Sequence, residues 1–376
     1  MKILHLCTTL DVGGAEMHLL SQVRGQAARG HEPSVAYLKG AGTLADDFRA
    51  AGAREVVAVG GALGVARSLM PMMRRADVVH THLLKADVLG AVAATLAGRR
   101  RRLISSKHND EQVLRRPLVS RVHGLVGRLP QRTIVLSDHV GRFIERYGRV
   151  PARRLTRIYY GLDPVPFEEA AALDPARRES LRRELGVQPT TTVFLCVARF
   201  AAQKAHDVLL TGFARARERT QAPLALWLVG DDPFGDGRER AEATAARLEL
   251  GESVRFLGIR RDVPHLMAAA DVFTMTSLWE GLGLVFLEAM ATGRPVLASG
   301  VSAVPEVVVD GETGLLVPPS DPDAWAAAAV RLAADPELRS RLGARGAQVR
   351  RERFGIDRMI DETIAVYEAV LERASA

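Results

Sequence analysis

Short apolar runs alternate with helix-like stretches along almost the whole chain, and no other feature restricts the fold as strongly. The runs are nearly continuous in aliphatic and β-branched residues, which is typical of strands in a parallel sheet covered by helices on both faces. Stretches of helical character separate them, for example 15–29 and 85–97. The runs lie at 2–7, 33–38, 55–59, 77–82, 102–106 and 133–137 in the first half, and at 191–199, 224–230, 253–258, 271–277, 295–299 and 314–318 in the second.

The runs form two series, and the 376 residues of the chain exceed what one ordinary core holds. Two such series predict an α/β protein built from two doubly wound domains. The join is expected within 157–170, where Pro164 and Pro166 interrupt regular structure and Gly161 permits a turn. The predicted domains are 1–163 and 164–355, and the predicted helices after the last strand are 321–332, 335–351 and 356–374.

Composition argues against disorder and against a membrane-spanning segment. Apolar residues make up 47% and charged residues 25% of the chain, and the longest apolar runs fall short of the roughly 18–20 residues that cross a bilayer. The apolar hexamer near the start is too short for a secretory signal and is expected to be a strand. Cys7 and Cys196 lie in strand-like runs, so we expect buried thiols and no disulfide. The expected location is the cytoplasm.

Positive charge is concentrated in residues 99–157. This stretch holds 16 Lys or Arg and four Asp or Glu, an excess of +12, whereas the whole chain carries +7. One interpretation is an arginine-rich, solvated surface. The other is a contact with anionic lipid headgroups, at the inner face of a membrane, or with a phosphorylated acceptor. Nucleic acid is not expected as a partner, because no helix-turn-helix, zinc pattern or aromatic platform accompanies the charge.

The segment SLWEGLGLVFLEAMATGRPVLAS (277–299) has the features of an anion site. It joins a strand to a helix that should begin near Leu284, so the N–H groups of Leu284 and Val285 lack intrahelical partners. The flexible Gly283 lets the backbone approach a ligand, and the positive end of the helix dipole favours a phosphate there. Glu280 and Glu288 flank this point, and carboxylates accept hydrogen bonds from hydroxyl groups. The spacing predicts a sugar on one side of the phosphate and a ribose on the other.

Two cations are expected to face the same phosphate. In VARFAAQKAHDVLL (197–210), Arg199 follows a strand and Lys204 precedes a helix. Arginine supplies a planar fork that matches phosphate oxygens, and lysine supplies a mobile point charge. Strand-end basic residues are common, so the pair gains weight only together with the helix that begins at Leu284.

Other polar residues follow strands in the first half. The turn TLDVGGAEMHLL places Gly13 and Gly14 where backbone amides can approach a diphosphate, although it lacks the G-x-G-x-x-G and G-K-[ST] patterns of nucleotide-binding loops. His80 and His82 end one strand and His108 ends the next. No cysteine or carboxylate pair stands near them at ligand spacing, so no metal site is expected. The DPD at 321–323 is predicted to cap a helix.

Taken in order, several motifs resemble the retaining glycosyltransferases of family 4. The motifs are YYGLD, VARF…K, VRFLG, SLWEGLGLVFLEAMATGRPVLAS and VPEVV.DGETGLLVPP, and they cover nearly the whole chain. The resemblance implies the GT-B fold, two Rossmann-like domains that face one another across a cleft and close by a hinge near 158–168. It also implies that helix 356–374 crosses back to the first domain.

The resemblance assigns a role to each candidate residue. Arg199, Lys204, the glycine at 283 and the amides of Leu284 and Val285 would bind the donor diphosphate, with Gly13 and Gly14 closing over it. Glu280 would hold the transferred sugar, Glu288 the ribose, and Ile259 would meet the base. His108 would lie beside the donor sugar and the acceptor. Three positions depart from the family pattern: Ala198 and Ala205 replace glycines, and Tyr160 replaces an asparagine.

The implied reaction is transfer of a hexosyl or N-acetylhexosaminyl group from a UDP- or GDP-sugar to an acceptor hydroxyl, with retention. We expect no cofactor and no catalytic metal, since fixed cations and a helix end can stabilise the leaving diphosphate. A sugar or lipid-linked sugar is the expected acceptor, in polysaccharide, lipopolysaccharide or glycolipid synthesis. The alternatives are a nucleotide-sugar epimerase or hydrolase on the same fold and a non-catalytic nucleotide-sugar binding protein.

Overall fold

The computed structural model describes residues 1–172, 174–232 and 235–375. The chain divides into two compact units. The first unit comprises Met1–Gly161 and Gly355–Ala376, and the second comprises Leu162–Phe354. This division falls inside the stretch in which the sequence predicts the join.

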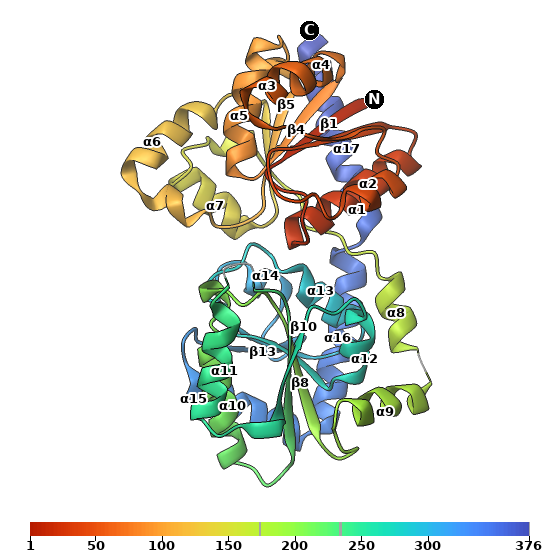
Figure 1. Ribbon diagram of the computed structural model, residues 1–376, viewed down its shortest axis with the longest axis vertical. Helices are drawn as coiled ribbons and strands as arrows, with labels where there is room; N and C mark the ends of the chain where they lie inside the picture. The colour runs from red at the N-terminus through yellow and green to blue at the C-terminus, as the bar shows by residue number, and fades with distance from the viewer. Residues whose placement is uncertain (173, 233–234, 376) are drawn as a thin grey trace. The chain divides into compact units, whose positions relative to one another are not determined.

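The first unit contains a parallel sheet with the order β3-β2-β1-β4-β5-β6-β7 (Figure 1). The direction of strand order reverses between β1 and β4, which is the topological switch point of a doubly wound sheet. The strands are β1 (Lys2–Cys7), β2 (Glu32–Tyr37), β3 (Val56–Ala58), β4 (Val78–His82), β5 (Leu103–Lys107), β6 (Arg132–Val135) and β7 (Leu155–Arg157).

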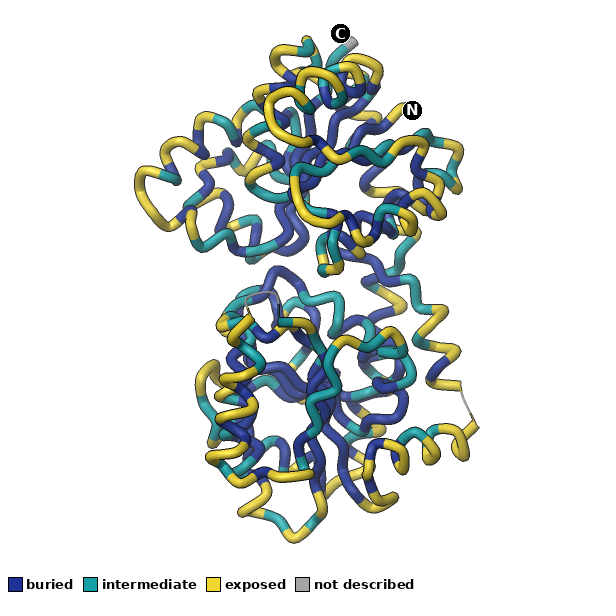
Figure 2. The backbone as a smooth tube through the Cα atoms, viewed as in Figure 1, coloured by how far each residue is buried: buried dark blue, intermediate teal, exposed yellow. Residues whose placement is uncertain are grey.

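Helices cover both faces of this sheet, so its strands are among the most deeply buried parts of the unit (Figure 2). The last helix, α17, packs Met359, Ile360 and Tyr367 against strand residues such as Ile3 and Ile104. The helices are α1 (Gly14–Ala28), α2 (Ala45–Ala50), α3 (Gly61–Gly64), α4 (Met70–Arg75), α5 (Leu84–Leu96), α6 (Pro117–Val126), α7 (Asp138–Arg146) and α17 (Ile356–Ser375), with a π-helical segment at Val65–Leu69 between α3 and α4.

The second unit repeats this design with the order β10-β9-β8-β11-β12-β13, again with parallel pairs. Its switch point lies between β8 and β11. The strands are β8 (Thr192–Val197), β9 (Leu224–Val229), β10 (Val254–Gly258), β11 (Val272–Met275), β12 (Val296–Ser299) and β13 (Gly314–Val317).

The helices of the second unit follow the same alternation. Two sequence predictions are confirmed here: Asp321 caps α15 by accepting a hydrogen bond from the Ala324 N–H at 2.9 Å, and Cys196, like Cys7 in the first unit, is a buried free thiol. The helices are α8 (Val165–Ala171), α9 (Pro175–Glu184), α10 (His206–Glu218), α11 (Gly237–Arg247), α12 (Val263–Ala269), α13 (Leu284–Ala291), α14 (Val304–Val307), α15 (Pro322–Ala334) and α16 (Pro336–Arg353).

Candidate active site

Three of the predicted site residues of the second unit, Arg199, Lys204 and Glu280, lie in the loops at its switch point. Strands β8 and β11 are neighbours in the sheet, and both end at the same edge. The loop after β8 carries Arg199 and Lys204, and the loop after β11 carries Glu280 and leads into α13. In open parallel sheets, ligands bind at the carboxyl ends of strands beside such a point.

Hydrogen bonds join these two loops. The backbone N–H of Leu278 donates to the carbonyl of Gln203 at 2.8 Å, and the Gln203 amide donates to the carbonyl of Trp279 at 2.6 Å. The Thr276 hydroxyl donates to the carbonyl of Ala205 at 3.0 Å. These contacts fix the two loops in register, which sets the lysine of one against the glutamate of the other.

Lys204 and Glu280 form an ion pair through Nζ and Oε1, and their side chains are only 13% and 7% exposed. The Ser277 hydroxyl donates to the same carboxylate oxygen at 2.6 Å. The sequence predicted that one residue binds a diphosphate and the other a sugar, and in the structure they contact each other. Because an ammonium has three donors and a carboxylate has two oxygens, the pair keeps free capacity for a ligand.

The helix that follows begins as predicted. Gly283 adopts φ +81°, in the left-handed region that favours glycine, and a Cβ there would lie 2.6 Å from Cδ2 of Phe286. Helix α13 then starts at Leu284, so the N–H groups of Leu284 and Val285 have no partner in the preceding turn of the helix. Its positive end thus lies a few residues after Glu280.

Glu288 lies one turn further along α13 and is partly buried. Burial raises the pKa of its carboxyl from 4.5 to about 7, because removal from water disfavours the charged form. A hydrogen-bond donor that approaches this carboxyl from a ligand would favour its ionised form.

Arg199 and Ile259 lie at the same edge of the sheet, after β8 and β10, and both are exposed. Neither takes part in the hydrogen bonds around Lys204 and Glu280. Ala205, which stands where the family pattern has glycine, adopts φ +46°. This departure therefore places a side chain at a left-handed position, which costs about 1 kcal/mol or more.

In the first unit, Gly13 and Gly14 occupy the turn between β1 and α1. Gly13 is extended, and a Cβ there would lie 2.5 Å from Oε2 of Glu16. The Thr9 hydroxyl donates to the other Glu16 oxygen at 2.7 Å. A Cβ at Gly14 would meet open space, so the backbone is accessible at this glycine.

His108 follows β5 and is 8% exposed. Its Nδ1 is 2.6 Å from the Tyr160 hydroxyl, and its Nε2 is 3.0 Å from Nδ1 of His82. Burial lowers the pKa of the imidazole to about 4, with a smaller rise from Asp87 and a lowering from Lys107. With both nitrogens engaged, this histidine is neutral near pH 7 and poorly arranged to accept a proton.

A buried ion pair that the sequence did not predict anchors the end of β5. Lys107 and Asp87 are 3% and 5% exposed and contact through Nζ and Oδ2. His123 lies 3.1 Å from the same Nζ. The signal in the sequence is weak, because a lysine at the end of an apolar run is expected to reach solvent.

His80 and His82, for which the sequence offered no ligand partner, meet a third histidine in the structure. His5, on β1, lies beside them, and the three offer nitrogen atoms within 4.8 Å of one another. Among residues 1–172, 174–232 and 235–375, these three histidines are the one cluster of three or more His, Cys, Asp or Glu side chains whose ligand atoms lie close enough together to hold a metal ion. All three rings are also hydrogen-bonded to protein groups.

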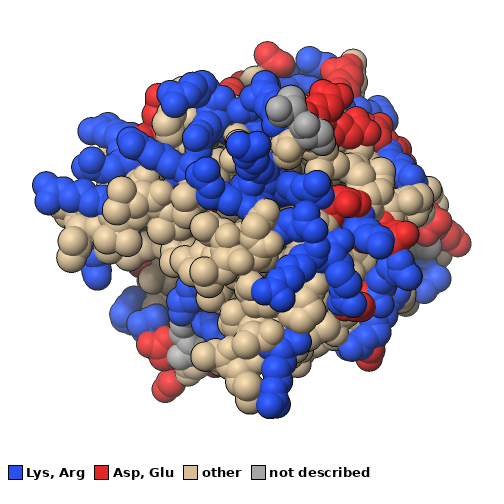
Figure 3. Space-filling model, turned by 90° about the horizontal axis from the view of Figure 1, so that it is seen from above, with Lys and Arg blue, Asp and Glu red and all other residues tan. Residues whose placement is uncertain are grey.

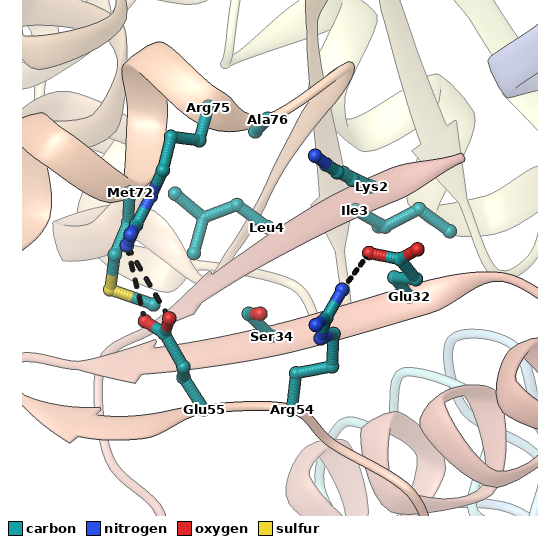
Figure 4. Close-up of a pocket in the computed structure, with 10 residues that line it drawn as sticks. All are labelled: Lys2, Ile3, Leu4, Glu32, Ser34, Arg54, Glu55, Met72, Arg75 and Ala76. Atoms are coloured by element: carbon teal, nitrogen blue, oxygen red, sulfur yellow. Dashed lines mark hydrogen bonds and ion pairs between the residues drawn. The ribbon is translucent and has the colours of Figure 1, made fainter.

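A hollow at the amino ends of the strands of the first sheet contains none of the predicted site residues. It lies at the amino ends of β1 and β2 and near the start of β3 (Figure 4). Arg54 pairs with Glu32 across it, and Arg75 approaches Glu55 at 3.4 Å. Ion pairs thus occupy this edge, whereas the predicted residues lie at the carboxyl ends of strands.

Two doubly wound units, each with polar residues gathered at its switch point, define a GT-B α/β protein, which confirms the predicted fold class. Residues 12–165 match the model of glycosyltransferase family 4, and residues 177–349 match glycosyl transferases group 1. The chain belongs to glycosyltransferase family 4, as the motifs predicted.

Its relatives include D-inositol 3-phosphate glycosyltransferases from Streptomyces. Those of Streptomyces bingchenggensis and Streptomyces scabiei are each 31% identical over 315 residues, covering 77% and 78% of this chain and 66% and 68% of theirs. The chain spans 53% and 49% of two Salinispora relatives. The crystal structure of Alr3699/HepE from Anabaena with UDP-glucose is 26% identical, with a TM-score of 0.86 over 97% of this chain and 100% of that one.

Proposed function

We propose that the protein transfers a sugar from a UDP- or GDP-sugar to an acceptor hydroxyl, with retention of anomeric configuration. The observation that carries this proposal is the Lys204–Glu280 pair placed just before the free N–H groups of α13. Cation and amide donors would stabilise the charge on the leaving diphosphate, while the carboxylate would bind sugar hydroxyls. UDP-glucose in the Anabaena relative supports the donor class.

The proposed chemistry assigns the acceptor proton to an oxygen of the leaving diphosphate. His108 has a low pKa and two engaged nitrogens, so its proposed part is to orient the reactants. Arg199 supplies a second cation for the diphosphate, and Glu288 binds the ribose hydroxyls. Since these groups provide the positive charge, we propose that turnover needs no metal and no cofactor.

A donor screen tests the proposal. The protein should be stabilised against heating by one class among UDP-, GDP-, ADP- and TDP-sugars, and turnover with an acceptor sugar should persist in EDTA. The variant Arg199→Ala tests the proposed contact with the diphosphate. It removes an exposed side chain and should change the unfolding free energy by less than about 0.5 kcal/mol. It should weaken nucleotide binding about 10- to 100-fold, because a charge-assisted hydrogen bond contributes roughly 1.5–3 kcal/mol.

Product analysis separates the alternatives. An epimerase or hydrolase would alter the donor without an acceptor, and a binding protein would be stabilised by the donor without turnover. Either result would refute glycosyl transfer, and an inverted anomeric product would refute retention.

We also propose a place where the acceptor is met, on one surface of the first unit. Helices α5 and α6 pack together and expose aliphatic side chains at helical spacing. Exposed arginines follow α5 and flank α6 in the sequence, and Lys and Arg side chains predominate over acidic ones on the left of Figure 3. We define the α5–α6 surface as Val88, Val92, Leu96, Leu118, Val122 and Leu125, together with the exposed arginines near them in the sequence, Arg100, Arg101, Arg115, Arg116, Arg121 and Arg128.

We propose that the α5–α6 surface lies on an anionic membrane, where a lipid-linked acceptor would be reached from the cytoplasm. Apolar side chains would enter the interface, and each arginine near it adds about 1 kcal/mol. No helix among the described residues is long and apolar enough to span a bilayer, so the proposed contact is peripheral.

Vesicle binding tests this contact. The protein should bind vesicles that contain 30 mol% phosphatidylglycerol and release them in 0.5 M salt, since surface charges are screened. Leu118→Gln with Leu125→Gln should weaken binding about tenfold or more. Leu63→Gln is the control, because Leu63 is 60% exposed but lies on α3. Equal binding of neutral vesicles, or equal loss in the control, would contradict the proposal.

A further inference from the structure

Three buried histidines connect Gln26, on α1, to Tyr160, which lies next to the end of the segment Met1–Gly161 of the first unit. Gln26 Oε1 lies 2.9 Å from Nε2 of His5, and Nδ1 of His5 lies 3.0 Å from Nε2 of His82. Nδ1 of His82 is 3.0 Å from Nε2 of His108, whose Nδ1 is 2.6 Å from the Tyr160 hydroxyl. We call these five residues the imidazole chain; each is at most 8% exposed.

The proton positions in the imidazole chain depend on one another. The Gln26 carbonyl oxygen can only accept, so Nε2 of His5 carries the hydrogen and its Nδ1 accepts from His82. The same reasoning gives His82 and His108 a hydrogen on Nε2, and it makes Tyr160 the donor to His108. A reversed Gln26 amide would reverse every bond together, so the arrangement is all or none. Because the amide of Gln26 does not relay protons, the chain fixes the orientation of the imidazole rings and does not transfer protons along its length.

Burial keeps the histidines of the chain neutral. It lowers the pKa of His5 to about 4, against a smaller rise from its bond to Gln26, and it lowers the pKa of His82 well below 6.5. His18 stacks on the Tyr160 ring with centroids 4.0 Å apart, which holds the far end of the chain.

A second series of hydrogen bonds also starts at Gln26, but it runs to Ser106 and does not include His108. The Gln26 amide donates to the Tyr367 hydroxyl at 3.3 Å, and that hydroxyl lies 2.6 Å from Nδ1 of His80. His80 Nε2 then meets the Ser106 hydroxyl at 2.7 Å. Tyr367 therefore holds the Gln26 amide as well as His80, whereas Ser106 ends this series with a hydroxyl that contacts His80 and not His108.

We propose that His5, His82 and Tyr160 are positioning residues that hold His108 as the Nε2–H tautomer in one orientation during glycosyl transfer. The inference rests on the proposed function and specifies how His108 serves it. A ring held from both nitrogens presents a fixed neutral dipole, and it neither takes up the acceptor proton nor rotates away. Tyr160 occupies a position where the family pattern has asparagine, so the hydrogen bond that its hydroxyl makes to His108 depends on a residue in which this chain departs from that pattern.

The pair Tyr160→Phe and Ser106→Ala tests the proposal. Each removes one buried hydroxyl bonded to a histidine, 2.6 Å from His108 in one case and 2.7 Å from His80 in the other, so both should lower the melting temperature. Tyr160→Phe should lower kcat about tenfold and change the donor KM less than threefold, whereas Ser106→Ala should change kcat less than twofold, because its bond is made to neither His108 nor Gln26. Equal kcat losses in the two variants would overturn the proposal.

Nitrogen-15 NMR of histidine-labelled protein supplies a readout that does not depend on turnover. His108 should appear as the Nε2–H tautomer, and its signals should shift in Tyr160→Phe far more than in Ser106→Ala. An Nδ1–H tautomer or a mixture would overturn the proposal. One tightly held zinc ion per chain would do so as well, because metal at His5, His80 and His82 would replace the His5–His82 hydrogen bond.

The two experiments also separate this inference from the proposed function. If no donor is turned over but the NMR spectra are as expected, the proposed glycosyl transfer is wrong, whereas the hydrogen bonds still hold His108 as the Nε2–H tautomer. His82→Asn adds a break in the middle of the chain and should lower kcat at least as much as Tyr160→Phe. A wild-type kcat in a folded His82→Asn protein would overturn the proposal.

Discussion

Replacement of Lys204 by methionine should lower kcat about 100- to 1,000-fold. Methionine keeps most of the side-chain volume and removes the cation that we propose meets the leaving diphosphate. Loss of one such preorganised donor costs roughly 2.7–4 kcal/mol of transition-state stabilisation. The donor KM should change far less, because the charge on the diphosphate develops as the glycosyl bond breaks. Steady-state kinetics with the donor found by the screen measures both quantities.

The same variant should also be less stable, which needs a control. Glu280 is 5% exposed, and without Lys204 it would be a buried carboxylate with Ser277 as its remaining partner. Breaking a buried pair in this way costs roughly 3 kcal/mol or more. The double variant Lys204→Met with Glu280→Gln removes both charges and should regain most of that stability without regaining turnover.

The comparison of these variants separates catalysis from folding. If turnover recovers with stability in the double variant, the ion pair is structural and the diphosphate clamp is wrong. Lys39→Met, at an exposed lysine of the first unit, should leave both properties unchanged. Glu280→Gln alone should reduce transfer more than the binding of bare nucleotide, since its proposed contact is to the sugar.

The sequence predicted the parallel α/β architecture because buried parallel strands leave a local mark. Runs such as 2–7 and 191–199 are apolar on both faces, and helices cover both faces of their sheets. Strand β7 (Leu155–Arg157) carries no such mark, because three residues of mixed polarity become a strand only through pairing with β6. Helix α6 carries no clear mark either, because its buried residues are Ser120, His123 and Gly124 while Leu118 and Leu125 are exposed, so it lacks the inward apolar stripe of a surface helix.

The candidate site could be predicted only where its groups are local. Gly283 and the start of α13 lie within one short segment, and the structure places them as expected. The contact between Lys204 and Glu280 spans 76 residues and depends on β8 lying next to β11. Strand order is a property of the whole sheet, so no spacing in the sequence reveals that the two charges meet.

The imidazole chain shows the same limit in the first unit. His5 lies in the middle of β1 and looks like an ordinary strand residue. It faces His80 across the sheet because β1 pairs with β4 in the register that sets these two opposite each other. The motifs marked His80, His82 and His108, and only the fold adds His5, Gln26 and the tyrosine hydroxyls that fix the rings.

Replacement of Glu288 by glutamine should have opposite effects on stability and on donor binding. The carboxyl has a pKa of about 7 in the folded protein and 4.5 as its ordinary value, so the folded state binds more protons between these values. Stability therefore falls as pH rises from about 4.5 to 7, and the full cost of the buried charge is present above pH 7. A tenfold change in proton affinity corresponds to about 1.4 kcal/mol, so the variant should be roughly 2–3 kcal/mol more stable at pH 8. At pH 4.5 the two proteins should be equally stable.

Donor binding should move the other way, because the ionised carboxylate is the proposed acceptor for the ribose hydroxyls. Loss of its charge should weaken nucleotide binding about tenfold at pH 8, since hydrogen bonds to charged groups contribute roughly 1.5–3 kcal/mol. Denaturant unfolding at pH 4.5 and 8, together with calorimetric titration of the nucleotide, measures both effects. Glu372→Gln, at an exposed glutamate of α17, should change neither. A variant that binds nucleotide as tightly as the wild type would remove Glu288 from the site, and unchanged stability at pH 8 would mean that solvent reaches the carboxyl.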